Sequence, residues 1–142
     1  MVRILIVEDE PIVAEAMSQL LGHAGHQVVG IAIDEASALQ QAEAGRPDLV
    51  LMDIRLSGSS DGIEAARKMR AEHPVDVVFM TAQQDANTRA RAAAVQPAGF
   101  IAKPFTCQQM LDAVSAAGAT RAASIDPVKP MGDTFVVADS IR

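Results

Sequence analysis

The chain has a single cysteine, no apolar run that approaches the length of a membrane span, and no excess of positive charge. Because Cys107 has no second cysteine to pair with, an internal disulfide is excluded. A transmembrane helix needs about 20 consecutive apolar residues, and the N-terminus reaches the acidic Glu8 before a signal-peptide core could form. We therefore expect a cytoplasmic protein without a membrane partner.

Acidic residues outnumber basic residues by 18 to 12, which gives a net charge of −6. Without a basic stripe there is no surface to release counterions from a phosphate backbone, so direct contact with nucleic acid is not expected. Neither a Walker-type loop nor a glycine-rich dinucleotide fingerprint follows any expected strand, which disfavours nucleotide binding. The acidic balance favours a cation site instead.

The 142 residues are 49% hydrophobic, enough for one domain with a real core. We place this domain at residues 1–117, because the alternation of strand and helix patterns ends near Gly118. The C-terminal extension, residues 118–142, is too short for a DNA-binding module with its own core. It is either a mobile terminus or a segment whose apolar residues 134–137 dock on the domain or on a partner.

A nearly continuous apolar stretch at residues 49–54 is typical of a fully buried parallel strand. Similar short runs alternate with segments of helical spacing, and this alternation predicts right-handed βαβ units. We therefore expect an α/β fold, a doubly wound (βα)5 domain with five parallel strands and helices on both faces. The expected strands are 4–7, 28–32, 49–54, 75–80 and 98–102, and the helices that follow them begin near Pro11, Asp34, Asp61, Gln84 and Thr106.

Local signals indicate where two helices begin and how firmly a third attaches. Asp61 with Glu64, and Thr106 with Gln109, have the spacing of a capping box. Residues 84–95 are rich in alanine and have almost no large apolar side chain, so this helix should attach weakly to the core.

Polar side chains stand at the carboxyl ends of four expected strands. Glu8 and Asp9 follow the first strand, Asp53 the third, Thr81 the fourth and Lys103 the fifth. Because these ends lie along one edge of a parallel sheet, the side chains should converge. Three clustered carboxylates repel one another, and a hard divalent cation such as Mg²⁺ relieves the repulsion. With a lysine and a hydroxyl to bind phosphoryl oxygens, these are the components of phosphoryl transfer to a carboxylate.

Five short motifs occur in order along the chain: Val7-Glu8-Asp9-Glu10-Pro11, Leu51-Met52-Asp53-Ile54-Arg55-Leu56, Asp61-Gly62-Ile63-Glu64, Met80-Thr81-Ala82 and Phe100-Ile101-Ala102-Lys103-Pro104-Phe105. Together they resemble the receiver domain of two-component response regulators, over about residues 3–117. A lone strand-end aspartate is weak evidence, whereas five motifs in register are specific. The resemblance implies a flavodoxin-like sheet.

The resemblance also implies a role for each acidic residue. Asp53 would be the phosphoacceptor, and Asp9 and Asp53 would bind Mg²⁺ directly. The backbone carbonyl of Arg55 would add a third protein oxygen, and Glu8 would act mainly through bound water.

A switch and a set of partners are implied in the same way. Thr81 would move toward the phosphoryl group and Phe100 would swing into the space vacated, while Lys103–Pro104 would be a cis peptide bond. The phosphodonor would be a sensor histidine kinase or a histidine phosphotransfer protein. The output would be altered binding to a downstream protein, with a phosphorylation-linked dimer as an open alternative.

Three residues depart from the frequent family pattern. Glu8 stands where aspartate is common, which preserves the charge. Phe100 replaces a frequent tyrosine, so an inward position would be held by packing alone. Arg55 could slow or redirect water attack on the acyl phosphate, and the phosphoryl lifetime is therefore not predicted.

We favour a free-standing phosphoacceptor domain that is not an enzyme beyond its own phosphorylation and dephosphorylation. A phosphotransferase or phosphatase of the haloacid-dehalogenase type also uses a strand-end aspartate, but its second aspartate is replaced here by Arg55. A phosphate-independent binding module is disfavoured by the set of Asp53, Thr81 and Lys103. The N-terminal receiver of a longer regulator remains a further alternative.

Overall fold

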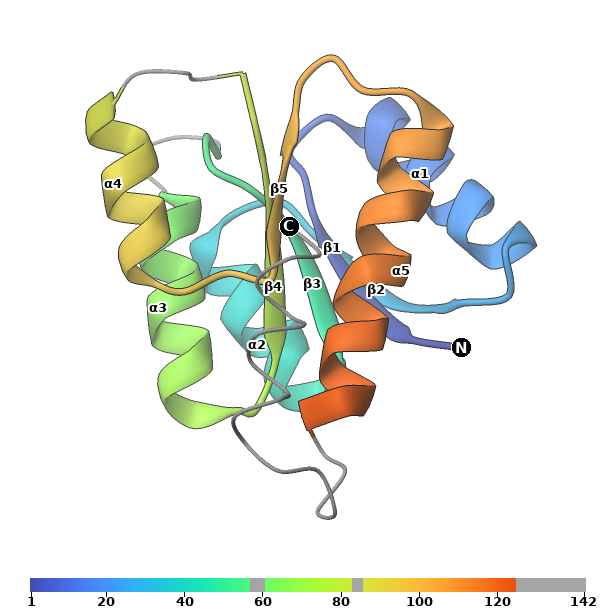
Figure 1. The fold of residues 1–142 in the computed structure, drawn as a ribbon, viewed down its shortest axis with the longest axis horizontal. Coiled ribbons are helices and arrows are strands. Elements are labelled where there is room, and N and C mark those ends of the chain that lie inside the picture. Colours follow the sequence, from blue (N-terminus) through green and yellow to red (C-terminus); the bar gives the residue numbers. More distant parts are fainter. Residues whose placement is uncertain (57–60, 83–85, 125–142) are drawn as a thin grey trace.

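The structure is a computed structural model that describes residues 1–56, 61–82 and 86–124. Strands and helices alternate strictly along the chain (Figure 1). The strands are β1 (Arg3–Val7), β2 (Gln27–Ala32), β3 (Leu49–Asp53), β4 (Asp76–Thr81) and β5 (Gly99–Ala102), and the helices are α1 (Pro11–His23), α2 (Glu35–Gly45), α3 (Gly62–Glu72), α4 (Ala86–Ala94) and α5 (Cys107–Ser124).

The five strands form one sheet in the order β2-β1-β3-β4-β5, and every neighbouring pair is parallel. Helices α1 and α5 cover one face, and α2, α3 and α4 cover the other (Figure 1). The expected doubly wound (βα)5 fold is confirmed. The strand order reverses between β1 and β3, and in such sheets this switch point is where ligands bind, beyond the carboxyl ends of the strands.

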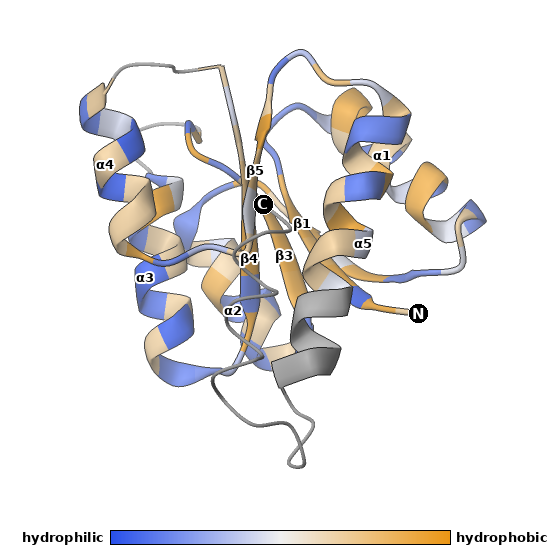
Figure 2. Ribbon diagram, in the orientation of Figure 1, coloured by the Kyte–Doolittle hydropathy of each residue, from blue (hydrophilic) through white to orange (hydrophobic). Residues whose placement is uncertain are grey.

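Strand β3 is buried along its whole length, as its apolar sequence predicts (Figure 2). Its side chains alternate between two cores, because successive residues of a strand point to opposite faces. Val50 and Met52 pack with α2 and α3, whereas Leu49 and Leu51 pack with α1 and α5. Burial on both faces therefore fixes the register that places Asp53 at the end of the strand.

One of the two predicted capping boxes is confirmed. The capping box at Thr106 is formed, since the Gln109 backbone N–H donates to the Thr106 hydroxyl at 3.0 Å and the Gln109 side chain accepts from the Thr106 backbone at 2.8 Å. The second expected box forms differently. Asp61 caps α3 by accepting from the Ile63 N–H at 2.8 Å, but the Glu64 carboxylate binds Arg67 one helical turn further on.

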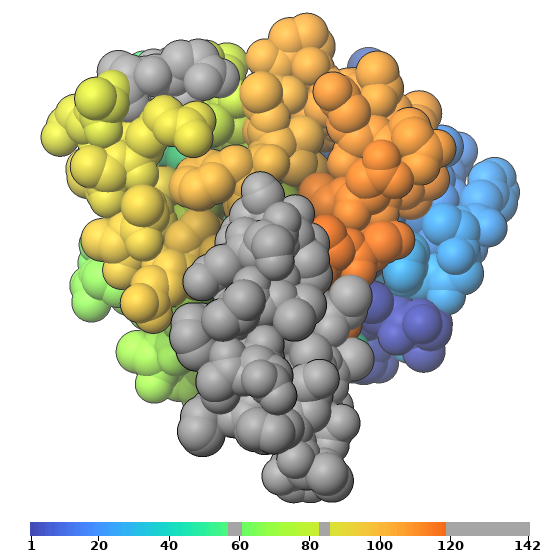
Figure 3. All heavy atoms as spheres, viewed as in Figure 1, coloured from blue at the N-terminus to red at the C-terminus, as the bar shows by residue number. Residues whose placement is uncertain are grey.

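Helix α4 attaches to the core by very little apolar surface, as its alanine-rich sequence predicts. Of its nine residues, only Ala92 is buried. Figure 3 shows the helix in yellow on the surface of the molecule. Its position must therefore depend largely on contacts other than core packing.

Helix α5 is longer than the sequence pattern indicates. It continues to Ser124, past Gly118, where we expected the domain pattern to end. The residues beyond Gly118 include several alanines, which favour helix without supplying an apolar stripe. The predicted docking segment, residues 134–137, lies outside the described residues. None of the described helices has the combined length and hydrophobicity that a membrane span requires.

Candidate functional site

All the buried polar or charged residues in the described part of the chain lie at the carboxyl edge of the sheet. They are Glu8 after β1, Asp53 at the end of β3 and Thr81 at the end of β4, each at most 5% exposed. Lys103 follows β5 and reaches the same place. The convergence predicted from the strand ends is therefore present, although these residues are up to 95 positions apart in sequence.

The Lys103 ammonium bridges two of the carboxylates. Its Nζ atom lies 2.8 Å from Asp53 Oδ2 and 3.0 Å from Glu8 Oε1. Burying an isolated carboxylate costs several kcal/mol, so this shared cation is what makes the buried pair tolerable.

Backbone groups hold the other oxygen of each carboxylate. The Arg55 N–H donates to Asp53 Oδ1 at 3.1 Å, and the Glu10 N–H donates to Glu8 Oε2 at 3.2 Å. Each carboxylate is thus fixed by one backbone donor and by Lys103. Their orientation is set before any ligand arrives.

Burial and charge shift two of the titrations in this site. Burial is the main cause that raises the pKa of Glu8, and the nearby Asp53 adds to it, while the bond to Lys103 works in the opposite direction. Burial alone would lower the pKa of Lys103, but its hydrogen bonds to Asp53 and Glu8 outweigh this, and the pKa is raised. Lys103 therefore remains a cation throughout the neutral range.

The fixed carboxylates line an open pocket of about 350 Å³. A second pocket of about 360 Å³ adjoins it and is mostly apolar, with Lys103 on both walls. The acidic pocket is therefore accessible to a small charged group. It is lined by Glu8, Asp9, Glu10, Asp53, Arg55, Ala82 and Lys103.

The acidic pocket has the donor set that a hard divalent cation prefers. One carboxylate oxygen from each of Glu8, Asp9 and Asp53 lies within 4.8 Å of the others. Mg²⁺ takes oxygen ligands and usually retains several waters, so three carboxylates beside an open pocket fit its chemistry. The backbone of Arg55 contacts the site through its N–H, and the role of its carbonyl as a ligand stays a prediction.

The two residues expected to act as a switch occupy different environments. Thr81 is buried, and its carbonyl accepts from the Lys103 N–H at 2.9 Å. Phe100 is 37% exposed, packs against Phe79 with ring centroids 5.9 Å apart, and has the Arg89 guanidinium 5.4 Å above its ring. This contact with a cation on α4 was not predicted, because arginines on a polar helix face are usually solvated.

The expected cis peptide bond is confirmed between Lys103 and Pro104. This bond follows the residue whose ammonium lies in the site and precedes the loop that leads into α5.

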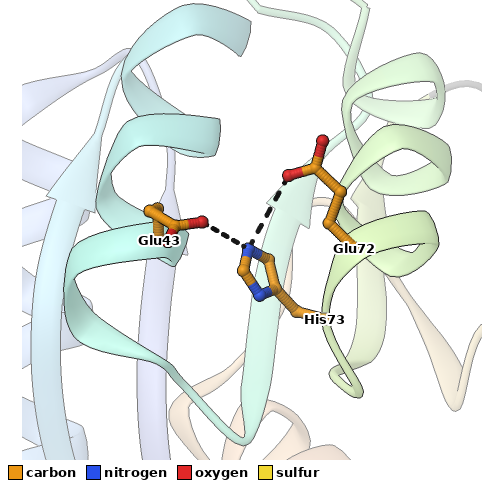
Figure 4. Close-up of side chains that lie close together, drawn as sticks. All are labelled: Glu43, Glu72 and His73. Atoms are coloured by element: carbon orange, nitrogen blue, oxygen red, sulfur yellow. Dashed lines mark ion pairs between the residues drawn. The ribbon is translucent and has the colours of Figure 1, made fainter.

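A second cluster of possible metal-binding side chains lies at the ends of α2 and α3 (Figure 4). His73 Nε2 is 3.2 Å from a Glu43 oxygen and 4.0 Å from a Glu72 oxygen. Within the described residues the other ring nitrogen, Nδ1, is buried and has no hydrogen-bond partner. A metal-bound histidine almost always donates this second N–H to an acceptor. We therefore interpret the cluster as a polar contact between two helices.

The sequence profile of the response regulator receiver domain matches residues 4–115. The chain is 34% identical over 117 residues to the transcriptional regulatory protein PdtaR of Mycobacterium tuberculosis, covering 81% of this chain and 56% of PdtaR. It is 38% identical over 103 residues to the phyllosphere-induced regulator PhyR of Methylorubrum extorquens, covering 72% of this chain and 38% of PhyR. The chain thus spans about half or less of the length of these relatives.

Solved structures agree with the sequence comparison. The signal receiver domain of a modulated diguanylate cyclase from Desulfovibrio desulfuricans superposes with a TM-score of 0.76 at 33% identity, covering 82% of this chain and 93% of that domain. The profile match covers most of the described residues and includes every strand end of the acidic site. The chain belongs to the response regulator receiver domain family of two-component signalling.

Proposed function

We propose that Asp53 accepts a phosphoryl group from a phosphohistidine of a sensor histidine kinase or a histidine phosphotransfer protein. An Asp53 oxygen attacks phosphorus, the phosphorus–nitrogen bond of the donor breaks, and the histidine nitrogen retains the electron pair. The observation that carries this proposal is the buried Asp53, whose carboxylate is held by Lys103 and the Arg55 N–H at the wall of an open acidic pocket. A carboxylate fixed in this way is oriented for attack.

Lys103 has a role before and after transfer. Before transfer its ammonium neutralises Glu8 and Asp53 at 3.0 Å and 2.8 Å. After transfer it can bind a phosphoryl oxygen, since a charge-assisted bond to phosphate replaces the bond to the carboxylate. Mg²⁺ held by Asp9 and Asp53, with Glu8 acting through water, would neutralise the charge that develops on the transferred group.

Phosphorylation would then be read at the edge of the sheet. It adds a charge of about −1.5 to −2 to the pocket, which is sufficient to bias an element with two arrangements. Thr81 lies at the end of β4, and Phe100 pairs with Phe79 in the β4–β5 ladder. We propose that Thr81 turns toward the phosphoryl group and that Phe100 changes its exposure in response.

The output of the domain is a change in affinity for a downstream protein. This proposal is supported by the exposed Phe100 and by a helix α4 that buries only Ala92. The curated relatives are longer than this chain, so this domain could instead regulate further domains in a longer protein.

Intact mass measured with and without acetyl phosphate and Mg²⁺ tests the assignment of Asp53. We expect the wild type to gain one phosphoryl group only in the presence of Mg²⁺, and Asp53→Asn to gain none. Asp112→Asn is the matched control, because Asp112 lies on α5, accepts a hydrogen bond from the Gln108 side chain at 2.8 Å, and is not among the residues that line the acidic pocket. Labelling of Asp53→Asn to the level of the control would overturn the assignment and favour a phosphate-independent binding module.

A further inference from the structure

The first turn of α3 packs directly against the backbone of Asp53. A β-carbon on Gly62 would lie 2.0 Å from the Asp53 carbonyl oxygen and 2.9 Å from the Ile54 α-carbon. These are backbone atoms that cannot rotate away, and the Gly62 N–H also donates to the Ile54 carbonyl at 2.9 Å. The end of β3 and the start of α3 are therefore expected to move as one unit.

Asp61 connects this unit to α4. Its Oδ1 caps α3 by accepting from the Ile63 N–H at 2.8 Å, and its Oδ2 lies 2.5 Å from the Arg91 guanidinium. Burial alone would raise the pKa of Asp61, but the bonds from Arg91 and from the start of α3 outweigh it, and the pKa is lowered. The ion pair is therefore charged at neutral pH.

Contacts of α4 other than core packing carry weight because Ala92 is its one buried residue, and they include the Arg89 guanidinium over Phe100 as well as the pair of Arg91 with Asp61. Beyond the end of the helix, Arg70 of α3 donates to the Val95 carbonyl at 2.7 Å. The Arg70 bond fixes the turn after α4. Arg91 lies within α4, and its partner Asp61 belongs to the start of α3, which packs against the Asp53 backbone. Arg91 is the contact best placed to transmit a change at the phosphoacceptor.

We propose that the ion pair between Asp61 and Arg91 is a positioning contact that couples the phosphoacceptor end of β3 to helix α4. While the pair is intact it holds α4 against the start of α3. When the end of β3 and the start of α3 shift together, the ion pair loosens and α4 is released. This inference deepens the proposed function and rests on it for the source of the shift, but the contact itself can be measured in unphosphorylated protein.

Hydrogen exchange of α4 amides tests the contact directly. Asp61→Asn retains an N-cap of equal quality while removing the charge, and Arg91→Gln removes the guanidinium. A partly exposed ion pair of this kind corresponds to about a two- to fivefold change in an equilibrium. We expect each variant to raise α4 exchange by about two- to fivefold, and the double variant to add nothing further, because both changes break the same contact.

Arg67→Gln is the matched control, since the ion pair of Arg67 is with Glu64 inside α3 and not with a residue of α4. We expect it to leave α4 exchange at the wild-type rate. Exchange in Arg91→Gln no faster than in this control, or effects of Asp61→Asn and Arg91→Gln that add in the double variant, would overturn the proposal.

Phosphorylation with acetyl phosphate and Mg²⁺ provides a second readout. The wild type should show faster α4 exchange after phosphorylation, whereas Arg91→Gln should show a smaller increase because its helix is already released. Equal increases in both proteins would refute the coupling. If no phosphoryl group is taken up at all, the proposed function fails, while the exchange rates of the unphosphorylated variants still decide whether the contact positions α4.

Discussion

Replacing Lys103 by methionine should leave two carboxylates facing each other without their shared cation. The Glu8 side chain is fully buried and that of Asp53 is 7% exposed. Methionine preserves most of the apolar stem of lysine, so the change removes a charge and two hydrogen bonds with little loss of packing. The expected defect is therefore electrostatic.

The size of the defect follows from the burial of the three groups. Removing one partner of a buried ion pair costs about 3–5 kcal/mol, because the remaining charge is left uncompensated. Lys103 is itself 24% exposed, so water screens part of the interaction, and Glu8 can take up a proton once the cation is gone. We expect the free energy of unfolding to fall by about 3 kcal/mol near neutral pH.

The defect should depend on pH in a defined direction. The pKa of Glu8 is raised in the folded protein, chiefly by burial, and Lys103 opposes that shift. A group with a raised folded pKa contributes stability below its unfolded pKa, and this contribution is lost as pH rises through the folded pKa. Without Lys103 the folded pKa of Glu8 rises further, so the deficit should grow between mildly acidic and neutral pH.

Urea denaturation of wild type and variant across this pH range measures the effect. Lys68→Met is the control, because its pair with Glu35 is 47% exposed on the lysine side and should contribute little. If Lys103→Met is no less stable than this control, or if its deficit is the same at every pH, the electrostatic reasoning is wrong.

Two further substitutions test the packing that positions the site. Gly62→Ala forces a β-carbon against the Asp53 backbone, so phosphorylation by acetyl phosphate should slow by about tenfold or more. Gly22→Ala is the control and should react like the wild type, because its β-carbon meets nothing within 4 Å. Equal phosphorylation rates for the two variants would contradict this account. Leu51→Ala removes a fully buried side chain of β3 and should lower the free energy of unfolding by about 2–5 kcal/mol, measured by urea denaturation. A cost near zero would mean that the burial of β3 contributes little to the stability of the fold.

The convergence of the acidic site was predictable because it depends on topology. Once the alternation of strands and helices indicates a parallel sheet, Glu8, Asp53 and Thr81 must share an edge whatever their separation in sequence. Lys103 follows by the same rule. The contacts within the site, including the Lys103 bridge to Asp53, then need only short adjustments of side chains.

The contacts of the arginines were not predictable for a physical reason. Arg89 and Arg91 lie two residues apart on a helix with little core packing, and their long side chains can reach many partners. Only the position of α4 in the fold selects Asp61 as the partner of Arg91 and Phe100 as the partner of Arg89. Glu64 is a second example. It has the spacing of a capping box, but its carboxylate forms an ion pair with Arg67 instead.

The position of Lys103 on the last strand has a consequence for the order in which the chain becomes competent. Its bonds to Glu8 and Asp53 span 95 and 50 residues, and β5 is an edge strand of the sheet. Contacts of such long range require the intervening loops to be closed, and that closure costs entropy. Glu8 and Asp53 can therefore share this cation only once β5 has joined β4. Uptake of phosphate by the wild-type chain therefore reports on a complete sheet, since the Lys103 ammonium that neutralises Asp53 is in place only when β5 is.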